Sequence, residues 1–186
     1  MYFVSRNNNK YREVLDLIRT LGEEHIELKF KNVELEEIQS NYLEKVSEHK
    51  AIQAFNKVEE DTLIEDDGLF IESLNGFPGV YSSYAFETVG NKGIVKLLEN
   101  QKNRQAQFRS AFGYYDGKNL KVFTGEIQGS ISFEPIGEGW GYDPIFIPND
   151  LNKTFAQIGH NLKNKISHRK IALEKFYHWY VKIKLP

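Results

Sequence analysis

Cysteine is absent from the 186 residues of this chain. The absence excludes a disulfide scaffold, a cysteine nucleophile and a thiolate zinc site. An excess of one charge is also lacking, because 24 basic residues face 26 acidic ones, for a formal net charge of −2. Proteins that bind nucleic acid generally carry a basic excess, so we expect no nucleic-acid partner.

Long apolar runs are lacking too. The longest, Met1–Val4, is far shorter than the roughly 20 residues that a membrane span requires. No hydrophobic signal-peptide region follows the start. We therefore expect a cytoplasmic protein with no membrane partner. The length favours one domain, or one domain with two lobes, over two independent domains. We take residues 1–186 as that single domain.

Hydrophobic periodicity predicts strands that alternate with helices in the first hundred residues, followed by a hairpin-rich segment. Short strands are expected at residues 2–5, 26–30, 62–64 and 130–135. Helices are expected at residues 10–21, 42–58, 93–98 and 167–182. Alternating apolar residues at 106–114 and 120–124 flank Asp116-Gly117, a hairpin signal. This pattern indicates an α/β fold with a mixed sheet.

The loop Ser5–Lys10 lies between a predicted strand and a predicted helix. Backbone N–H groups and the helix dipole at such a place favour a bound phosphate, and Lys10 adds a positive charge. The glycines of a P-loop are missing. The alternative is an ordinary asparagine-rich turn.

The acidic run Glu65-Asp66-Asp67-Gly68 is expected at the end of the strand at 62–64. Adjacent carboxylates repel one another unless a cation lies among them. Carboxylate oxygens together with phosphate oxygens are ligands that suit Mg²⁺, which typically takes one or two protein carboxylates. The alternative is a solvated acidic turn.

Two further segments carry candidate binding residues. In the loop Trp140-Gly141-Tyr142-Asp143, two large rings flank a glycine, so a flat ligand such as a nucleobase could stack there. The alternative is a pair of loop aromatics that close the core.

In the segment 163–170, Ser167 resembles a helix N-cap. His168 and Arg169 then fall in the first helical turn, where positive charge opposes the dipole and a bound anion would relieve the conflict. The alternative is a solvated basic patch.

Six segments, taken in order, resemble the inosine triphosphate pyrophosphatase family, with the archaeal-type branch most similar. They are Ser5–Lys10, Glu37–Gln39, Glu65–Phe70, Asn75–Ser82, Gly139–Pro144 and Lys163–Arg169. The match runs nearly from end to end, and its most specific parts are Phe77–Ser82 and Ser167–Arg169. The resemblance implies an elongated, two-lobed α/β fold around a long twisted mixed β-sheet with flanking helices, with the active site in the cleft between lobes.

The resemblance also implies an activity and a homodimer. Inosine, deoxyinosine or xanthosine triphosphate would be hydrolysed to the monophosphate and pyrophosphate with Mg²⁺, which cleanses the nucleotide pool. The family's roles fall on individual positions of this sequence. The triphosphate signature matches Ser5, Asn7 and Lys10, and the loop backbone adds Arg6, Asn8 and Asn9. The metal ligands match Glu37, with Glu36 as the adjacent alternative, and Asp66. Asp66 also matches the family's proposed general base, and Asp67 is the alternative proton acceptor.

The remaining matches are substrate contacts. They fall on Trp140, Gly141, Tyr142, Asp143, Lys163, His168 and Arg169. We expect Lys10, Lys163 and Arg169 to stabilise the pyrophosphate leaving group. A donor from His168, Arg169 or a backbone N–H would select a 6-keto purine over adenine.

Some positions depart from the family pattern. Asp67 stands where the family usually has Ser or Thr next to the substrate, which removes a hydroxyl donor and adds a negative charge. A lysine that some relatives carry in the second helix has no clear counterpart, and Lys50 is the nearest candidate, one residue out of register.

Two other functions compete with this interpretation. Asp66-Asp67-Gly68 after a strand resembles the nucleophile motif of a haloacid dehalogenase-type phosphatase, although Glu65 occupies the position of the required Asp. Alternatively, Asp67 impairs catalysis and the chain is a catalytically weak purine nucleotide sensor.

Overall fold

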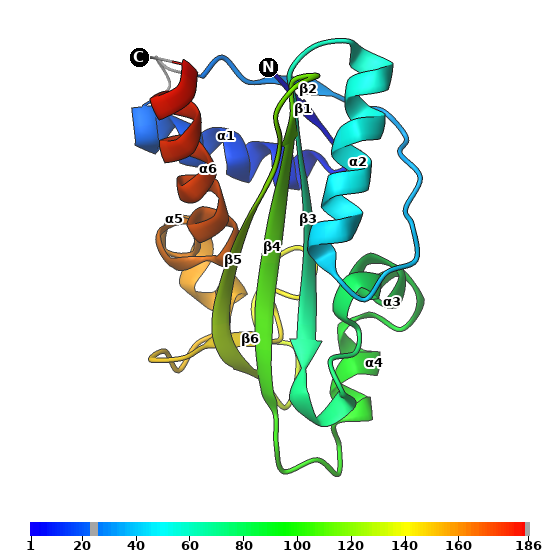
Figure 1. Ribbon diagram of the computed structural model, residues 1–186. Coiled ribbons are helices and arrows are strands. Elements are labelled where there is room, and N and C mark those ends of the chain that lie inside the picture. The colour runs from blue at the N-terminus through cyan, green and yellow to red at the C-terminus, as the bar shows by residue number, and fades with distance from the viewer. Residues whose placement is uncertain (23–25, 185–186) are drawn as a thin grey trace. The chain divides into compact units, whose positions relative to one another are not determined.

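The structure, a computed structural model, describes residues 1–22 and 26–184. Its strands are β1 (Tyr2–Val4), β2 (Lys29–Lys31), β3 (Thr62–Ile71), β4 (Gln105–Tyr115), β5 (Leu120–Ile131) and β6 (Phe146–Pro148). They form one sheet in the order β2-β1-β3-β4-β5-β6 (Figure 1). Strand β1 is parallel to both β2 and β3, whereas β5 and β6 are antiparallel. The prediction of an α/β fold with a mixed sheet is therefore confirmed.

Six α-helices flank the strands in the described residues. They are α1 (Asn8–Gly22), α2 (Leu43–Val58), α3 (Ser82–Thr88), α4 (Gly90–Leu97), α5 (Phe155–Ile166) and α6 (His168–Lys184). Two short 3₁₀ turns, η2 (Glu72–Leu74) and η3 (Gly79–Tyr81), precede α3. Helices α1, α2, α4 and α6 agree with the sequence prediction to within about two or three residues, an ordinary uncertainty for helix ends. Among the described residues, none of the helices is both long and apolar enough to cross a membrane.

Three predictions about local structure were wrong. The acidic run 65–68 does not follow a strand but lies in the middle of β3, which continues to Ile71. The strand predicted at 130–135 is the end of the long strand β5, which stops at Ile131. Helices α3 and α5 were not predicted, and α5 contains Gly159 with a positive φ of 75°, which interrupts its helical geometry and its periodicity.

The chain divides into two compact units. Unit 1 comprises Met1–Asp66, Ser110–Gly125 and Arg169–Pro186. Unit 2 comprises Asp67–Arg109 and Glu126–His168. Each unit is assembled from segments that are distant in sequence, and the candidate site residues fall into both.

The core of unit 1 has two sides because side chains alternate along its strands. Phe3 and Leu63 belong to the cluster that α1 and α6 cover. Their neighbours Val4 and Ile64 belong to a second cluster, which α2 covers. In Figure 1, α2 accordingly lies on the opposite side of β1 and β3 from α6. Consecutive residues of β3 in this unit therefore face different helices, and this alternation decides which cations their side chains meet.

The core of unit 2 is rich in aromatic rings. The ring of Phe108 lies 4.8 Å from that of Phe146 and 6.1 Å from that of Phe155, measured between centroids. Aliphatic side chains from β3, α4 and β5 complete the cluster, including Leu69, Ile94 and Ile131. This core supports the loop 139–145 and helix α5, which carry most of the predicted base contacts.

Candidate functional site

The loop Ser5–Lys10 is a capped helix N-terminus. The side-chain oxygen of Asn7 accepts hydrogen bonds from the backbone N–H groups of Asn9 (2.9 Å) and Lys10 (3.3 Å). The hydroxyl oxygen of Ser5 accepts one from the N–H of Asn7 (3.0 Å). Asn7 is thus an N-cap for α1. Two of the backbone donors expected to face a phosphate are already satisfied by this cap.

The other residues of this loop lie at the surface. Asn8 and Asn9 are exposed. Arg6 is exposed as well, and its Nη1 forms an ion pair with Oε1 of Glu34 at 3.1 Å. Surface pairs of this kind contribute little to stability. Arg6 therefore remains able to exchange its carboxylate partner for another anion.

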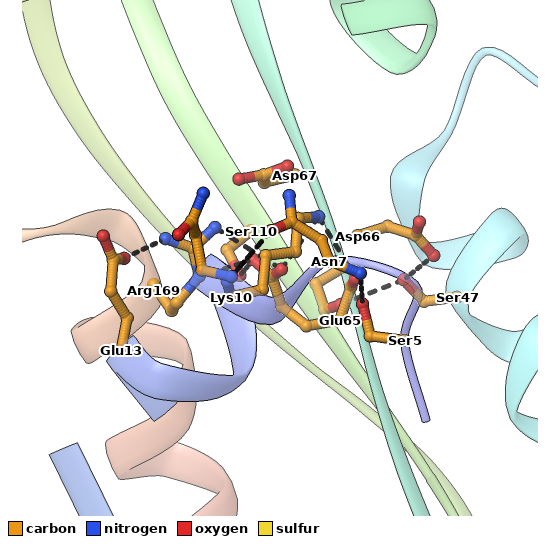
Figure 2. A network of polar contacts seen from close by, with 12 residues as sticks. Ser5, Asn7, Lys10, Glu13, Ser47, Glu65, Asp66, Asp67, Ser110 and Arg169 are labelled. Atoms are coloured by element: carbon orange, nitrogen blue, oxygen red, sulfur yellow. Dashed lines mark hydrogen bonds and ion pairs between the residues drawn. The ribbon is translucent and has the colours of Figure 1, made fainter. Parts of the chain in front are cut away.

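A buried cluster of charged groups, here called the Glu65 cluster, lies beside the first turns of α1 (Figure 2). Oε2 of Glu65 accepts Nζ of Lys10 at 3.0 Å, and Oε1 of Glu65 accepts Nε of Arg169 at 3.2 Å. The hydroxyl of Ser110 donates to the same Oε1 at 2.7 Å. Arg169 also pairs through Nη1 with Glu13. The cations of Lys10 and Arg169 and the carboxylates of Glu13 and Glu65 therefore form one buried network of ion pairs.

Burial changes the interpretation of Arg169. Its side chain has no exposed surface, and its partners are carboxylates from α1 and β3. The conflict between a cation and the first turn of α6 is therefore relieved inside the protein, by Glu13 and Glu65, without a bound anion. Sequence reasoning missed Glu13, although a glutamate one turn after Lys10 on an otherwise apolar helix face is a signal for a buried pair.

A second cluster of charges lies on the α2 side of the same strand. Nζ of Lys50 donates to Oδ1 of Asp66 at 2.6 Å and also pairs with the carboxylate of Glu37. The hydroxyl of Ser47 lies 3.4 Å from Oδ2 of Asp66. Lys50, the nearest candidate for the lysine that some relatives carry in the second helix, is thus the residue that contacts both predicted metal ligands.

The pKa of Asp66 is raised above its ordinary value. Burial is the largest cause, and the negative charge of Glu37 adds to it. The positive charges of Lys50 and Lys10 act in the opposite direction without cancelling the effect. Asp66 is therefore a stronger base than a solvated carboxylate, which is the property that a proton acceptor needs.

The two carboxylates around Lys50 fit a divalent cation. The oxygens of Glu37 and Asp66 converge on one positively charged atom, so the place where they meet already accommodates positive charge. The described residues contain no group of three or more His, Cys, Asp or Glu side chains arranged to hold a metal. Two carboxylates suffice for Mg²⁺ when water and substrate phosphates supply the other ligands.

In unit 2 the structure brings Trp140, Asp143 and Lys163 together. Nζ of Lys163 lies 2.6 Å from Oδ2 of Asp143 and 4.7 Å from the centre of the Trp140 ring. Lys163 and Asp143 are buried, with 3% and 7% of their surfaces exposed. A lysine held between a carboxylate and an indole face is ordered by both contacts. These three predicted site residues, from the loop and from α5, form one group.

Asp67, Tyr142 and His168 are also neighbours in unit 2. Nε2 of His168 lies 3.8 Å from Oδ2 of Asp67, and the imidazole stacks on Phe108 with centroids 4.6 Å apart and planes inclined by 6°. Burial raises the pKa of Tyr142, and the charge of Asp67 adds to the shift. The Tyr142 hydroxyl donates to the carbonyl of Ser82 at 2.8 Å. Tyr142 is therefore a neutral structural donor.

Gly141 separates the two rings of the loop. Its φ of 59° lies in the left-handed region, where a side chain would be strained. The carbonyl of Gly141 accepts a hydrogen bond from the side chain of Asn91 at 3.0 Å. This contact with α4 fixes the backbone between Trp140 and Tyr142.

Comparison with known proteins places these observations in a family. A model of the Ham1 family matches residues 1–179. The chain is 47% identical over 180 residues to a dITP/XTP pyrophosphatase of Methanopyrus kandleri, covering 96% of this chain and 94% of that protein. It is 48% identical over 181 residues to a dITP/XTP pyrophosphatase of Pyrococcus horikoshii, covering 96% and 95%. The solved structure of a HAM1 protein from Coxiella burnetii matches with a TM-score of 0.83 and 28% identity, covering 98% of this chain and 99% of that one.

Proposed function

This chain belongs to the Ham1 family, and on that premise we propose that it hydrolyses the non-canonical purine nucleoside triphosphates ITP, dITP and XTP. The products are the nucleoside monophosphate and pyrophosphate. The observation that carries the proposal is that the carboxylates of Glu37 and Asp66 both contact Lys50. The carboxylate of Glu65, the neighbour of Asp66 in β3, binds Lys10. Clustered carboxylates and cations are what hydrolysis of a polyphosphate requires.

Lys10 and its loop bind the triphosphate in this proposal. Nζ of Lys10 lies 3.0 Å from the carboxylate of Glu65, and 13% of the Lys10 side chain is exposed to solvent. It can therefore reach a phosphate oxygen without leaving its carboxylate. Ser5 and Asn7 shape the loop through their mutual hydrogen bond. The exposed side chains of Arg6, Asn8 and Asn9 contribute donors from its outer surface.

Asp66 is the proposed general base. It accepts a proton from the water that attacks the α-phosphorus, and its raised pKa makes it suited to that step. Lys50 holds the carboxylate in place, and its positive charge favours the ionised form against the effect of burial. Glu37 and Asp66 are the residues that would hold Mg²⁺. When bound, the ion would neutralise phosphate charge and orient the substrate.

Residues of unit 2 bind the purine in this proposal. Trp140 offers a ring face on which a nucleobase can stack. Gly141 and Tyr142 set the shape of the loop, and Asp143 orders Lys163, the proposed phosphate contact, through an ion pair of 2.6 Å. His168 would donate to the 6-keto group of the base.

Asp67 replaces the family's usual hydroxyl residue, and its place beside His168 suggests a different use. A carboxylate near an imidazole favours the form that donates hydrogen bonds. Asp67 would thus support the donor that reads a keto purine. This assignment argues against Asp67 as a second base.

We also propose a homodimer. Several large apolar side chains near α3 are exposed, among them Tyr81 (46%), Tyr84 (70%) and Phe77 (41%). Exposed aromatic groups of this kind are characteristic of protein interfaces. Sedimentation velocity tests the proposal: a Tyr84→Glu variant is expected to shift the chain to monomer, and a wild-type monomer at micromolar concentration would contradict it.

The experiment that tests the function is product analysis with ITP and Mg²⁺. Pyrophosphate and IMP are expected in equal amounts. Inorganic phosphate as the product would favour a phosphatase instead, although the motif of that class follows a strand end whereas Asp66 and Asp67 lie within β3. Tight ITP binding without turnover would favour a nucleotide sensor.

A further inference from the structure

The segment 32–40, which contains the proposed metal ligand Glu37, belongs to no helix or strand. In Figure 1 it runs beside α2. None of its residues forms a backbone–backbone hydrogen bond with another described residue. A carboxylate that must meet a metal ion in a defined geometry therefore stands on a backbone that neither a sheet nor a helix orders.

Gln53 of α2 supplies hydrogen bonds that this backbone otherwise lacks. Its Oε1 accepts the backbone N–H of Glu36 at 3.0 Å, and its Nε2 donates to the backbone carbonyl of the same residue at 2.8 Å. One side-chain amide thus satisfies both backbone groups of Glu36, as a neighbouring strand would. The two bonds fix the planar peptide groups on either side of Glu36, and the second of these groups leads directly to Glu37.

Two further side chains of α2 support this arrangement. Nδ1 of His49, one turn before Gln53, lies 2.8 Å from Nε2 of Gln53 and accepts the second hydrogen of the amide. Nζ of Lys57, one turn after Gln53, donates to the backbone carbonyl of Glu34 at 2.8 Å. One face of α2 therefore holds the segment at two places, and the Gln53 contact is the one adjacent to Glu37.

The side chains of the segment alternate between the interior and solvent. Val33 and Leu35 pack against the apolar cluster that α2 covers, whereas Glu36 is exposed. Glu37 follows in the same alternation as Val33 and Leu35, and its carboxylate pairs with Lys50. Fixing the backbone of Glu36 thus also determines that Glu37, and not Glu36 itself, faces the metal site.

We propose that Gln53 is a positioning residue for the divalent cation, which acts through the backbone of Glu36 to hold the carboxylate of Glu37 at the site it shares with Asp66. This inference rests on the proposed function, because that function makes Glu37 and Asp66 the metal ligands. The two Gln53 bonds order the segment when the chain folds, so the entropic cost of ordering does not fall on metal binding. Without them the affinity for the ion decreases, while purine binding and the chemical step are unchanged.

The experiment measures Mn²⁺ binding to the full chain by electron paramagnetic resonance, in the wild type and in Gln53→Met. Met has a similar size and a similar helix propensity, but it makes neither bond to Glu36. The dissociation constant is expected to rise about tenfold, the lower end of the usual effect of an outer-shell residue on metal affinity. Gln53→Ala, which adds no apolar bulk, is expected to give the same result.

The dependence of ITP hydrolysis on Mg²⁺ gives a second measurement. The half-saturating Mg²⁺ concentration of Gln53→Met should rise by about the same factor as the Mn²⁺ dissociation constant. At saturating Mg²⁺, kcat should remain within about twofold of the wild type, because the assembled site is the same.

A double variant shows whether the effect passes through Glu37. Glu37→Gln alone is expected to weaken Mn²⁺ binding at least as much as Gln53→Met, because it removes a charged oxygen ligand. Adding Gln53→Met to Glu37→Gln is expected to cause no further loss. A general structural role of Gln53 would not produce this dependence.

Gln107→Met is the matched control. Gln107 is a partly buried residue of β4 in unit 2, and its Oε1 accepts Nε and Nη2 of Arg109 at 2.9 and 2.6 Å. The same substitution therefore removes an amide that makes two hydrogen bonds, without affecting the segment 32–40. The control is expected to leave Mn²⁺ binding unchanged, and thermal melting of each variant checks that it is folded.

Unchanged Mn²⁺ affinity in folded Gln53→Met and Gln53→Ala would overturn the inference. An additive loss in the double variant would also overturn it, and so would a much lower kcat at saturating Mg²⁺, which would assign Gln53 to the chemical step. If the wild type binds no Mn²⁺, the inference fails together with the metal site. If Gln53→Met weakens Mn²⁺ binding but the wild type releases no pyrophosphate from ITP, the inference stands and the proposed function is refuted instead.

Discussion

Glu65 and Asp66, neighbours in strand β3, direct their carboxylates to opposite faces of the sheet. Glu65 meets Lys10 on the side that α1 and α6 cover, and Asp66 meets Lys50 on the side that α2 covers. The alternation of side chains along a strand makes this separation unavoidable. Two adjacent acidic residues therefore meet different cations: Glu65 pairs with Lys10, the proposed phosphate ligand, and Asp66, the proposed general base, pairs with Lys50.

Asp66→Asn is expected to reduce turnover of ITP by about 10²–10⁴, the usual contribution of a general base. The amide keeps the size of the side chain and removes its ability to accept the proton. The measurement is kcat for pyrophosphate release with Mg²⁺. Asp16→Asn is the control, because Asp16 is a partly exposed residue of α1 that pairs with Arg19. Turnover close to wild type in Asp66→Asn would remove Asp66 from the mechanism.

The same substitution is expected to stabilise the fold at neutral pH. Burial raises the pKa of Asp66 above its ordinary value of 3.8, so the folded chain holds this proton more tightly than the unfolded chain does. Stability from this group is present below that value and is lost as the pH rises through the folded pKa. The Asn side chain does not ionise, so the variant does not lose stability as the pH rises.

Thermal melting at two pH values checks this second effect. Asp66→Asn should melt above the wild type near neutral pH, and the difference should disappear at about pH 3, where both forms are neutral. A variant that melts below the wild type at neutral pH would show that the Lys50 ion pair outweighs the cost of burial.

Trp140→Ala is expected to raise KM for ITP by about 10- to 100-fold, since stacking on an aromatic side chain contributes about 1–3 kcal/mol per base. Trp140→Phe keeps a ring and should remain within a few-fold of wild type. Steady-state kinetics of the two variants give the comparison. Equal KM values for the Ala and Phe variants would mean that the indole only closes the core.

Gly68→Ala is expected to destabilise the fold by about 1–3 kcal/mol through overpacking. A Cβ at this position would lie 2.4 Å from the backbone oxygen of Gly79, which has little freedom to move. Gly141→Ala offers a contrast, because its Cβ would meet no atom within 4 Å and only its φ of 59° is unfavourable. Denaturant unfolding should show the larger loss for Gly68→Ala, and the reverse order would contradict the packing argument.

Periodicity and motif order predicted much of this molecule. The 3.6-residue pattern gave helices α1 and α2 to within a few residues, because each buries a single apolar face. It could not give the continuous strand β3, since three consecutive acidic residues favour a turn on local grounds. Their stability within a strand depends on Lys10, Lys50 and Arg169, which come from three distant parts of the chain.

The candidate site was predictable in its residue types more than in its pairings. The motifs identified Lys10, Asp66 and Lys163 as charged groups of interest. The pairing of Lys163 with Asp143 and of Lys50 with Asp66 depends on side-chain directions that spacing does not encode. Helix α5 escaped prediction because Gly159 breaks its periodicity, although its capping box at Thr154 and Gln157 is a local signal for its start.

The central claim is that this chain releases pyrophosphate from purine nucleoside triphosphates whose base lacks the 6-amino group of adenine and the 2-amino group of guanine. The most direct test is kcat/KM for pyrophosphate release from XTP, ITP, dITP, GTP and ATP with Mg²⁺. The account predicts high and comparable values for XTP, ITP and dITP, with ATP lower by a factor on the order of 10⁴. Equal values for ATP and ITP would contradict it.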